Sequence, residues 1–120
     1  MAWIVHFHDD FDAEFDRFDL EVREHIMASV NLLKQFGPAL TRPHVDTLNG
    51  SKFANMKELR FKTGSGVWRV LFAFDSERQA IVLVGANKQG QSEPRFYKSL
   101  IALADRRFGS WIEQLKETLG

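Results

Sequence analysis

The sequence predicts an α+β fold in which an N-terminal strand and a helical hairpin pack on a mostly antiparallel sheet, followed by a C-terminal helix. Residues 56–86 hold three short runs of apolar, β-branched and aromatic residues separated by turn signals, as in an antiparallel meander. Apolar positions before and after this stretch recur at helical spacing. The predicted order of elements is therefore β-α-α-β-β-β-α, within a single domain that spans residues 1–120.

The N-terminal third carries one strand signal and two helix signals. Residues 3–7 alternate as a strand does, and we expect this strand to lie at an edge of the later sheet. Phenylalanines at helical spacing predict a short helix over residues 9–17. Asp19 is suited to cap a second helix over residues 20–36, which ends at Gly37 and the proline after it.

The remaining elements follow from turn residues. Residues 39–55 are predicted to be irregular, because they contain a proline and an Asn-Gly pair. The turns of the meander are predicted at residues 63–66 and 75–79. A last helix is predicted from residue 94 to about residue 116, with a bend at Gly109.

Composition and charge exclude several classes of protein. With no cysteine, the chain has no disulfide, no thiolate zinc site and no cysteine nucleophile, which suits a reducing cytoplasm. No apolar run approaches ~18 residues, so we expect no membrane-spanning helix. The histidines are too scattered to predict a metal site. Net charge is zero, which argues against unselective coating of nucleic acid, but residues 1–24 hold eight acids and two bases.

Alternation in the strands predicts which side chains share a face of the sheet. Trp68 and its alternating partners should face the helical hairpin, which leaves Arg60 and Arg69 on an open face. A loop over residues 63–66 places these two arginines directly opposite each other, where they repel unless an anion lies between them. The same argument on the second hairpin places Gly85 opposite Arg69 and leaves room beside the guanidinium.

These positions supply candidates for binding and proton transfer. Arg60 and Arg69 suit a phosphate, or form ordinary salt bridges with residues such as Glu58 or Asp75. Tyr97 could stack on a base or transfer a proton, or be a half-buried helix aromatic. His44 could be an acid or base, or an incidental loop residue. The lysines and arginine that could widen an anion-binding surface, or be ordinary solvated residues, are Lys52, Lys57, Lys62, Lys88, Arg95 and Lys98.

A resemblance covers nearly the whole chain. The segments MKELRF, VWRVLFAFD, IVLVGANKQG, PRFYK and ALADRR follow one another in this order, preceded by LLKQFGPAL and RPHVDTLNGS. This combination resembles the HigB-type branch of the RelE/ParE toxin superfamily.

The resemblance implies a RelE-like fold and a toxin of a type II toxin–antitoxin system. Such toxins bind the ribosomal A site and cut mRNA without a metal or another cofactor, by attack of a 2′-OH on the adjacent phosphate. The matching positions imply that Arg60 and Arg69 stabilise the phosphate and that Lys88 binds it or supplies a proton. Tyr97 would stack or transfer a proton, with His44 as a reserve acid or base. The implied partners are a HigA-like helix-turn-helix antitoxin, the ribosome and mRNA.

Two other readings remain open on sequence alone. The superfamily includes ParE-like toxins that bind gyrase and have no nuclease chemistry, and a nontoxic relative that only binds a partner is also compatible with the fold.

Overall fold

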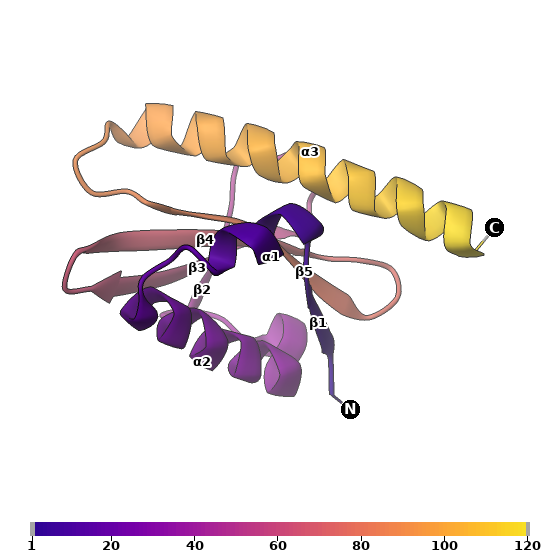
Figure 1. Ribbon diagram of the computed structural model, residues 1–120. Coiled ribbons are helices and arrows are strands. Elements are labelled where there is room, and N and C mark those ends of the chain that lie inside the picture. Colours follow the sequence, from indigo (N-terminus) through magenta and orange to yellow (C-terminus); the bar gives the residue numbers. More distant parts are fainter. Residues whose placement is uncertain (1, 120) are drawn as a thin grey trace.

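The computed structural model describes residues 2–119 and has the predicted α+β fold with a five-stranded mixed sheet (Figure 1). The strands lie in the order β1-β5-β4-β3-β2, and every neighbouring pair is antiparallel except β1 and β5. In chain order, the elements are β1 (Ile4–Phe7), α1 (Asp9–Phe15), α2 (Leu20–Phe36), the 3-10 turn η1 (Gly37–Ala39), β2 (Val45–Thr47), β3 (Met56–Thr63), β4 (Gly66–Phe74), β5 (Gln79–Asn87) and α3 (Glu93–Leu119).

The second helix begins and ends where the sequence predicted. Asp19 is its N-cap, and Oδ1 of this residue accepts a hydrogen bond from the backbone N–H of Val22 at 3.0 Å. Gly37 ends the helix with a φ of 51°, and a Cβ built there would collide with the indole of Trp3. Only glycine tolerates both conditions, so α2 stops at this residue.

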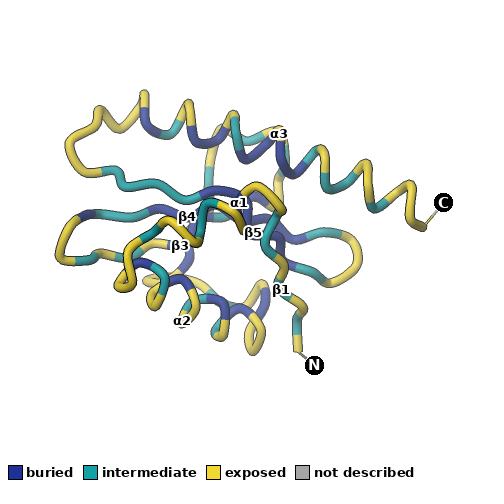
Figure 2. The backbone as a smooth tube through the Cα atoms, in the orientation of Figure 1, coloured by how far each residue is buried: buried dark blue, intermediate teal, exposed yellow. Residues whose placement is uncertain are grey.

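Helices cover both faces of the sheet, and the expectation of one open face is wrong. Helices α1 and α2 lie on one side and α3 lies on the other (Figure 1). Figure 2 shows buried backbone along β4, β5 and the sheet-facing side of α3. The sequence of β4 is consistent with this burial, because apart from Arg69 its residues are apolar on both faces, as is typical of a strand buried on both sides.

Two hydrophobic clusters hold these layers together. On the α2 face, Val22, Ile26 and Leu33 pack with residues of β3, β4 and β5. On the α3 face, Leu100 and Phe108 pack with the alternate residues of the same strands. The sheet is therefore a shared wall between two cores, and polar residues on it are enclosed unless they lie near an end or an edge.

A missed strand, the end of α1 and the course of α3 differ from the prediction. Strand β2 lies inside residues 39–55, and three residues next to a proline are too short to give a strand pattern. Helix α1 ends at Phe15 rather than at residue 17, and α3 runs through Gly109 as one continuous helix.

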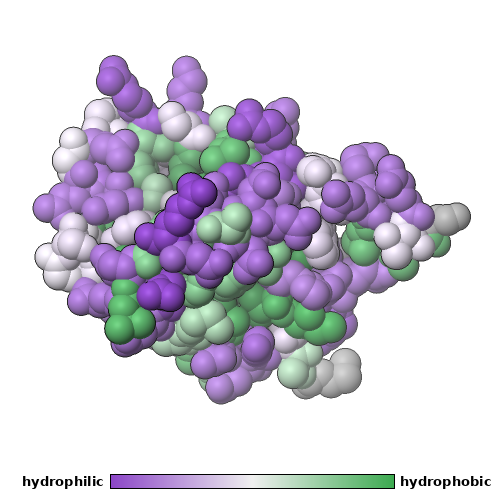
Figure 3. All heavy atoms as spheres, in the orientation of Figure 1, coloured by the Kyte–Doolittle hydropathy of each residue, from purple (hydrophilic) through white to green (hydrophobic). Residues whose placement is uncertain are grey.

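The outer surface of the N-terminal helix is polar. The first turn of α1 carries three acids, and hydrophilic side chains cover most of the face on which α1 lies (Figure 3). Apolar patches are visible below it, toward α2.

Candidate active site

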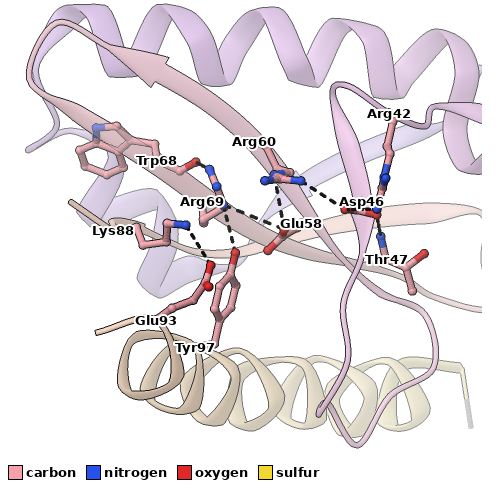
Figure 4. A network of polar contacts seen from close by, with 10 residues as sticks. All are labelled: Arg42, Asp46, Thr47, Glu58, Arg60, Trp68, Arg69, Lys88, Glu93 and Tyr97. Atoms are coloured by element: carbon pink, nitrogen blue, oxygen red, sulfur yellow. Dashed lines mark hydrogen bonds and ion pairs between the residues drawn. The ribbon is translucent and has the colours of Figure 1, made fainter. Parts of the chain in front are cut away.

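Strands β3 and β4 bring Arg60 and Arg69 directly opposite each other, as the sequence predicted. Figure 4 shows the two guanidinium groups beside Glu58, with Tyr97 of α3 below them and Lys88 to one side. Four of the predicted site residues, from three different elements and one loop, thus lie in one polar cluster.

Arg69 is the buried centre of this cluster, with an exposed fraction of 5%. Its Nε donates a hydrogen bond to the hydroxyl of Tyr97 at 3.0 Å, and Nη1 donates to the carbonyl of Trp68 at 2.9 Å. The side chain lies under the first turns of α3 instead of on an open face. Its position is therefore fixed before any ligand arrives.

The position predicted opposite Arg69 is occupied by Ala86, and the prediction of Gly85 is wrong. A β-bulge explains the difference, because Leu71 pairs with Val84 and Phe72 pairs with Val82, which leaves Leu83 without a partner. The extra residue moves the register by one.

Glu58, which the sequence suggested only as a salt-bridge partner, lies between the two arginines of the cluster. Its Oε1 lies 3.7 Å from Nε of Arg60 and 4.0 Å from Nε of Arg69. The residue is 5% exposed, and Oε2 has no hydrogen-bond partner. Burial raises the pKa of Glu58 above its usual range, although the Tyr97 hydroxyl and the two guanidinium groups oppose that rise. A buried carboxyl with a raised pKa and a free oxygen can accept a proton.

The hydroxyl of Tyr97 remains protonated at neutral pH. Burial raises its pKa above the ordinary value, and the neighbouring Glu58 raises it further, against the opposing effect of Arg69. Tyr97 is therefore suited to donate a hydrogen bond or a proton, and it is not suited to remove one.

Arg60 is more open, with an exposed side-chain fraction of 40%, and it is paired within the chain. Its Nη1 donates to Oδ2 of Asp46 at 3.2 Å. The anion that two opposed arginines require is thus supplied by Glu58 and Asp46. The arginine pair alone no longer indicates a phosphate, and the unpaired oxygen of Glu58 and the hydroxyl of Tyr97 now carry that argument.

Lys88 borders the cluster at the start of the loop that leads into α3. Its Nζ lies 3.0 Å from Oε1 of Glu93, and its backbone N–H donates to the carbonyl of Val67 at 2.7 Å. Asn87 braces the same loop, because its Oδ1 accepts from the N–H groups of Val67 and Gln89. The backbone of Lys88 is fixed, and its ammonium faces the first turn of α3 (Figure 4).

Comparison with known proteins identifies the family. Residues 13–109 match the family model described as "Phage derived protein Gp49-like (DUF891)". The chain belongs to this family. This Gp49-like chain is 43% identical over 101 residues to HigB2 and 44% identical over 103 residues to HigB3, two proteins of Mycobacterium tuberculosis designated candidate toxins. The matches cover 83% and 82% of this chain, half of HigB2 and 88% of HigB3.

Solved structures with the same fold are RelE toxins. A double mutant of Escherichia coli RelE in the free state gives a TM-score of 0.61 at 16% identity, over 89% of this chain and 98% of RelE. RelE in the RelE–RelB complex of Pyrococcus horikoshii gives 0.55 at 14% identity, over 76% and 100% of the two chains. The intact E. coli RelBE complex gives 0.53 at 15% identity, over 72% and 96%. The Gp49-like chain is thus of the HigB type and has a RelE-like fold, as its motifs predicted.

The other predicted binding residues of this HigB-type chain lie around the cluster rather than in it. Lys52 lies in a loop whose backbone is bonded to Asp105 of α3 at 3.0 Å. Lys57 alternates with Glu58 and so lies on the α2 side of the sheet edge. His44 is exposed just before β2, and its carbonyl accepts from the N–H of Arg60 at 3.1 Å. Lys62 is exposed near the end of β3, and Arg95 and Lys98 are exposed near the start of α3.

Within residues 2–119, no group of three or more His, Cys, Asp or Glu side chains could hold a metal ion. Among the same residues, no helix is both long enough and apolar enough to span a membrane.

Proposed function

We propose that this protein is the toxin of a type II toxin–antitoxin pair and that it cuts mRNA on the ribosome. Two relatives at 43% and 44% identity are designated candidate toxins, and structures with the same fold are RelE toxins, two of them solved with RelB. These likenesses support a toxin with an antitoxin partner. The nuclease chemistry rests on the polar cluster of this chain.

The observation that carries the proposal is the convergence of three groups between the sheet and the start of α3. These groups are a proton acceptor, Glu58, a fixed cation, Arg69, and a protonated hydroxyl, that of Tyr97. Glu58 has a free Oε2 and a raised pKa, and Arg69 lies 4.0 Å from its Oε1. The Tyr97 hydroxyl accepts from Arg69 at 3.0 Å. A metal-independent RNA cleavage needs a base for the 2′-OH, cations for the phosphorane and an acid for the leaving oxygen.

The proposed reaction assigns these groups to one displacement. Glu58 accepts the proton of the 2′-OH, whose oxygen forms a bond to the adjacent phosphorus as the bond to the 5′-oxygen breaks. The guanidinium of Arg69 stabilises the negative charge of the phosphorane. Tyr97 orients the phosphate through Arg69 or donates to the leaving oxygen, and Lys88 binds the phosphate or supplies that proton. The products are a 2′,3′-cyclic phosphate and a 5′-hydroxyl.

The proposed partners follow from the same assignment. The toxin acts in the cytoplasm on mRNA in the ribosomal A site, and a HigA-like helix-turn-helix antitoxin neutralises it. Two of the acids in residues 1–24, Asp10 and Glu14, pair with Arg107 of α3, and the basic residues around Arg60 are left to meet RNA.

Induced expression followed by 5′-end mapping of mRNA tests the function. We expect growth arrest with codon-linked cuts that end in a 5′-hydroxyl, and loss of those cuts in Arg69→Lys protein that keeps its wild-type melting temperature. Cleavage of a ribosome-bound message should also stop when the attacking 2′-OH is replaced by hydrogen. Arrest with intact mRNA and broken DNA would instead assign the protein to the gyrase-binding class, and no arrest would assign it to the nontoxic class.

A further inference from the structure

A second constellation lies at the edge of the sheet, where two arginines hold one carboxylate oxygen. Nη2 of Arg42 lies 3.0 Å from Oδ2 of Asp46, and Nη1 of Arg60 lies 3.2 Å from the same atom. The backbone N–H of Thr47 donates to the other oxygen, Oδ1, at 2.8 Å. Figure 4 shows these donors reaching Asp46 from opposite sides.

The exposure of the three side chains is arranged as in an anion site. Arg42 is 78% exposed and Arg60 is 40% exposed, whereas Asp46 is only 19% exposed. The cations are therefore open to solvent while the carboxylate lies between them. Because exposed ion pairs of this kind contribute little to stability, a stronger anion can replace the carboxylate. A phosphate accepts the same guanidinium donors in bidentate geometry.

A hollow beside Asp46 offers room for that exchange. Its volume is about 250 Å³, and its polar lining includes Arg42, Asp46, Thr47 and Lys57. A water molecule takes up about 30 Å³ in the liquid, so the hollow can accept a displaced carboxylate together with its hydration.

The constellation also lies within reach of the proposed reaction centre. Asp46 pairs with Glu58 on the next strand, and Glu58 pairs with Leu71 on the strand that carries Arg69. Two strand spacings separate β2 from β4, which is about 10 Å. A short stretch of extended RNA can bridge this distance.

We propose that Arg42 and Arg60 form a second phosphate subsite, which Asp46 occupies in the free protein and leaves when an RNA phosphodiester binds. The inference rests on the proposed function, because it supplies the subsite next to the scissile phosphate. Asp46 then weakens RNA binding by competition and keeps both guanidinium groups in place. The neutral net charge of the chain fits this arrangement, since internal acids neutralise the cations that face RNA.

The test is the affinity of Asp46→Asn for a 2′-O-methylated RNA hexamer, which cannot be cleaved, measured by fluorescence anisotropy at about 50 mM salt and at higher salt. Asparagine keeps an oxygen for the N–H of Thr47, so β2 is retained. The matched control is Asp12→Asn, the same charge change at an exposed position on α1. Melting temperatures of all variants establish that the fold is intact.

We expect Asp46→Asn to bind roughly three- to tenfold more tightly than Asp12→Asn at low salt, because two exposed pairs no longer compete with RNA. For Asp46→Asn, the plot of the logarithm of the binding constant against the logarithm of the salt concentration should be steeper by about 0.7. This change corresponds to the release of one more counterion from the RNA. The gain should vanish in the double variant Arg42→Ala/Asp46→Asn. If Asp46→Asn binds only the single-stranded hexamer more tightly, the phosphate that occupies the subsite belongs to mRNA. If it also binds an RNA hairpin with the same number of phosphates more tightly, the phosphate belongs to ribosomal RNA.

Equal affinities of Asp46→Asn and Asp12→Asn at every salt concentration would overturn the inference. A gain that persists without Arg42, or no detectable binding by wild type and Asp46→Asn alike, would also overturn it. Cleavage of ribosome-bound mRNA by the Arg69→Lys and wild-type proteins decides the proposed function separately, so failure of the subsite and failure of the nuclease assignment are distinguishable.

Discussion

Replacing Glu58 with glutamine should abolish cleavage and make the protein more stable. Glutamine keeps the size of the side chain but cannot accept a proton from the 2′-OH. General base catalysis contributes about 10²- to 10⁴-fold to a rate, so we expect a loss of that size in the rate of the chemical step. Few substitutions raise stability and remove activity together, and a base held in an unfavourable environment is one case in which they do.

The gain in stability follows from the surroundings of the carboxyl group. Glu58 is 5% exposed, and its Oε2 has no partner. Glutamine removes the negative charge, and with it the cost of burying an ionised carboxylate, which the nearby guanidinium groups offset only in part. We therefore expect the free energy of unfolding to rise by about 1 kcal/mol, which is about 4 °C in melting temperature for a domain of this size.

The gain in unfolding free energy of Glu58→Gln over the wild type should increase as the pH rises. Burial raises the pKa of Glu58 in the folded protein above its value in the unfolded chain. The stability that this group contributes is therefore fully present below the unfolded pKa and is lost as the pH rises through the folded pKa. Glutamine cannot titrate, so the advantage of the variant should be larger near pH 7 than near pH 4.

Urea unfolding at these two pH values and single-turnover cleavage of ribosome-bound mRNA measure the two effects. Glu24→Gln, at an exposed position on α2, is the matched control and should change neither quantity. The wild-type rate should fall on the acid side as Glu58 takes up its proton. Cleavage by Glu58→Gln at the wild-type rate would refute the assignment of the base, and an equal change in stability at both pH values would refute the electrostatic argument.

Three further substitutions test other parts of the argument. Tyr97→Phe removes the hydroxyl that accepts a hydrogen bond from Arg69 and should lower the single-turnover rate about 10²-fold with little change in melting temperature; an unchanged rate would exclude a role for the hydroxyl. Gly66→Ala places a Cβ within 2.5 Å of the Asn87 side chain, whose bonds brace the loop, and should cost about 1–2 kcal/mol in urea unfolding. Arg107→Met leaves a buried carbonyl without its donor and should cost about 1–3 kcal/mol, whereas the exposed neighbour Arg106→Met should cost under about 0.5 kcal/mol; equal costs would contradict this.

The elements that were predicted correctly are those set by local chemistry. The cap at Asp19 and the positive φ of Gly37 fix the ends of α2 from within a few residues. The short turn between β3 and β4 fixes their register, so the pairing of Arg60 with Arg69 followed from the number of residues between them.

The surroundings of the candidate site depend on contacts between distant parts of the chain. Glu58, Arg60 and Lys62 alternate with apolar residues, which is the pattern of a strand with one face in water. Helix α3, some 40 positions later in the sequence, packs over the first of these residues and leaves the others exposed. The burial that raises the pKa of Glu58 was therefore not visible in the strand itself, although the apolar residues on both faces of β4 indicated a covered sheet.

The bulge at Leu83 has two effects. It shifts the pairing of β5 with β4 by one residue from the predicted register, and it frees a carbonyl that helps to hold α3 in place. The extra residue in β5 makes Ala86 the partner of Arg69, where the prediction had placed Gly85. It also leaves the carbonyl of Leu83 out of the ladder between β4 and β5, and this carbonyl accepts from Nη1 of Arg107 at 2.7 Å. The same guanidinium binds Glu14 of α1 through two bonds of 2.8 and 2.6 Å. Because Arg107 joins α1, β5 and α3 at this point, the irregularity that shifts the register also supplies the acceptor that holds α3 over the candidate site.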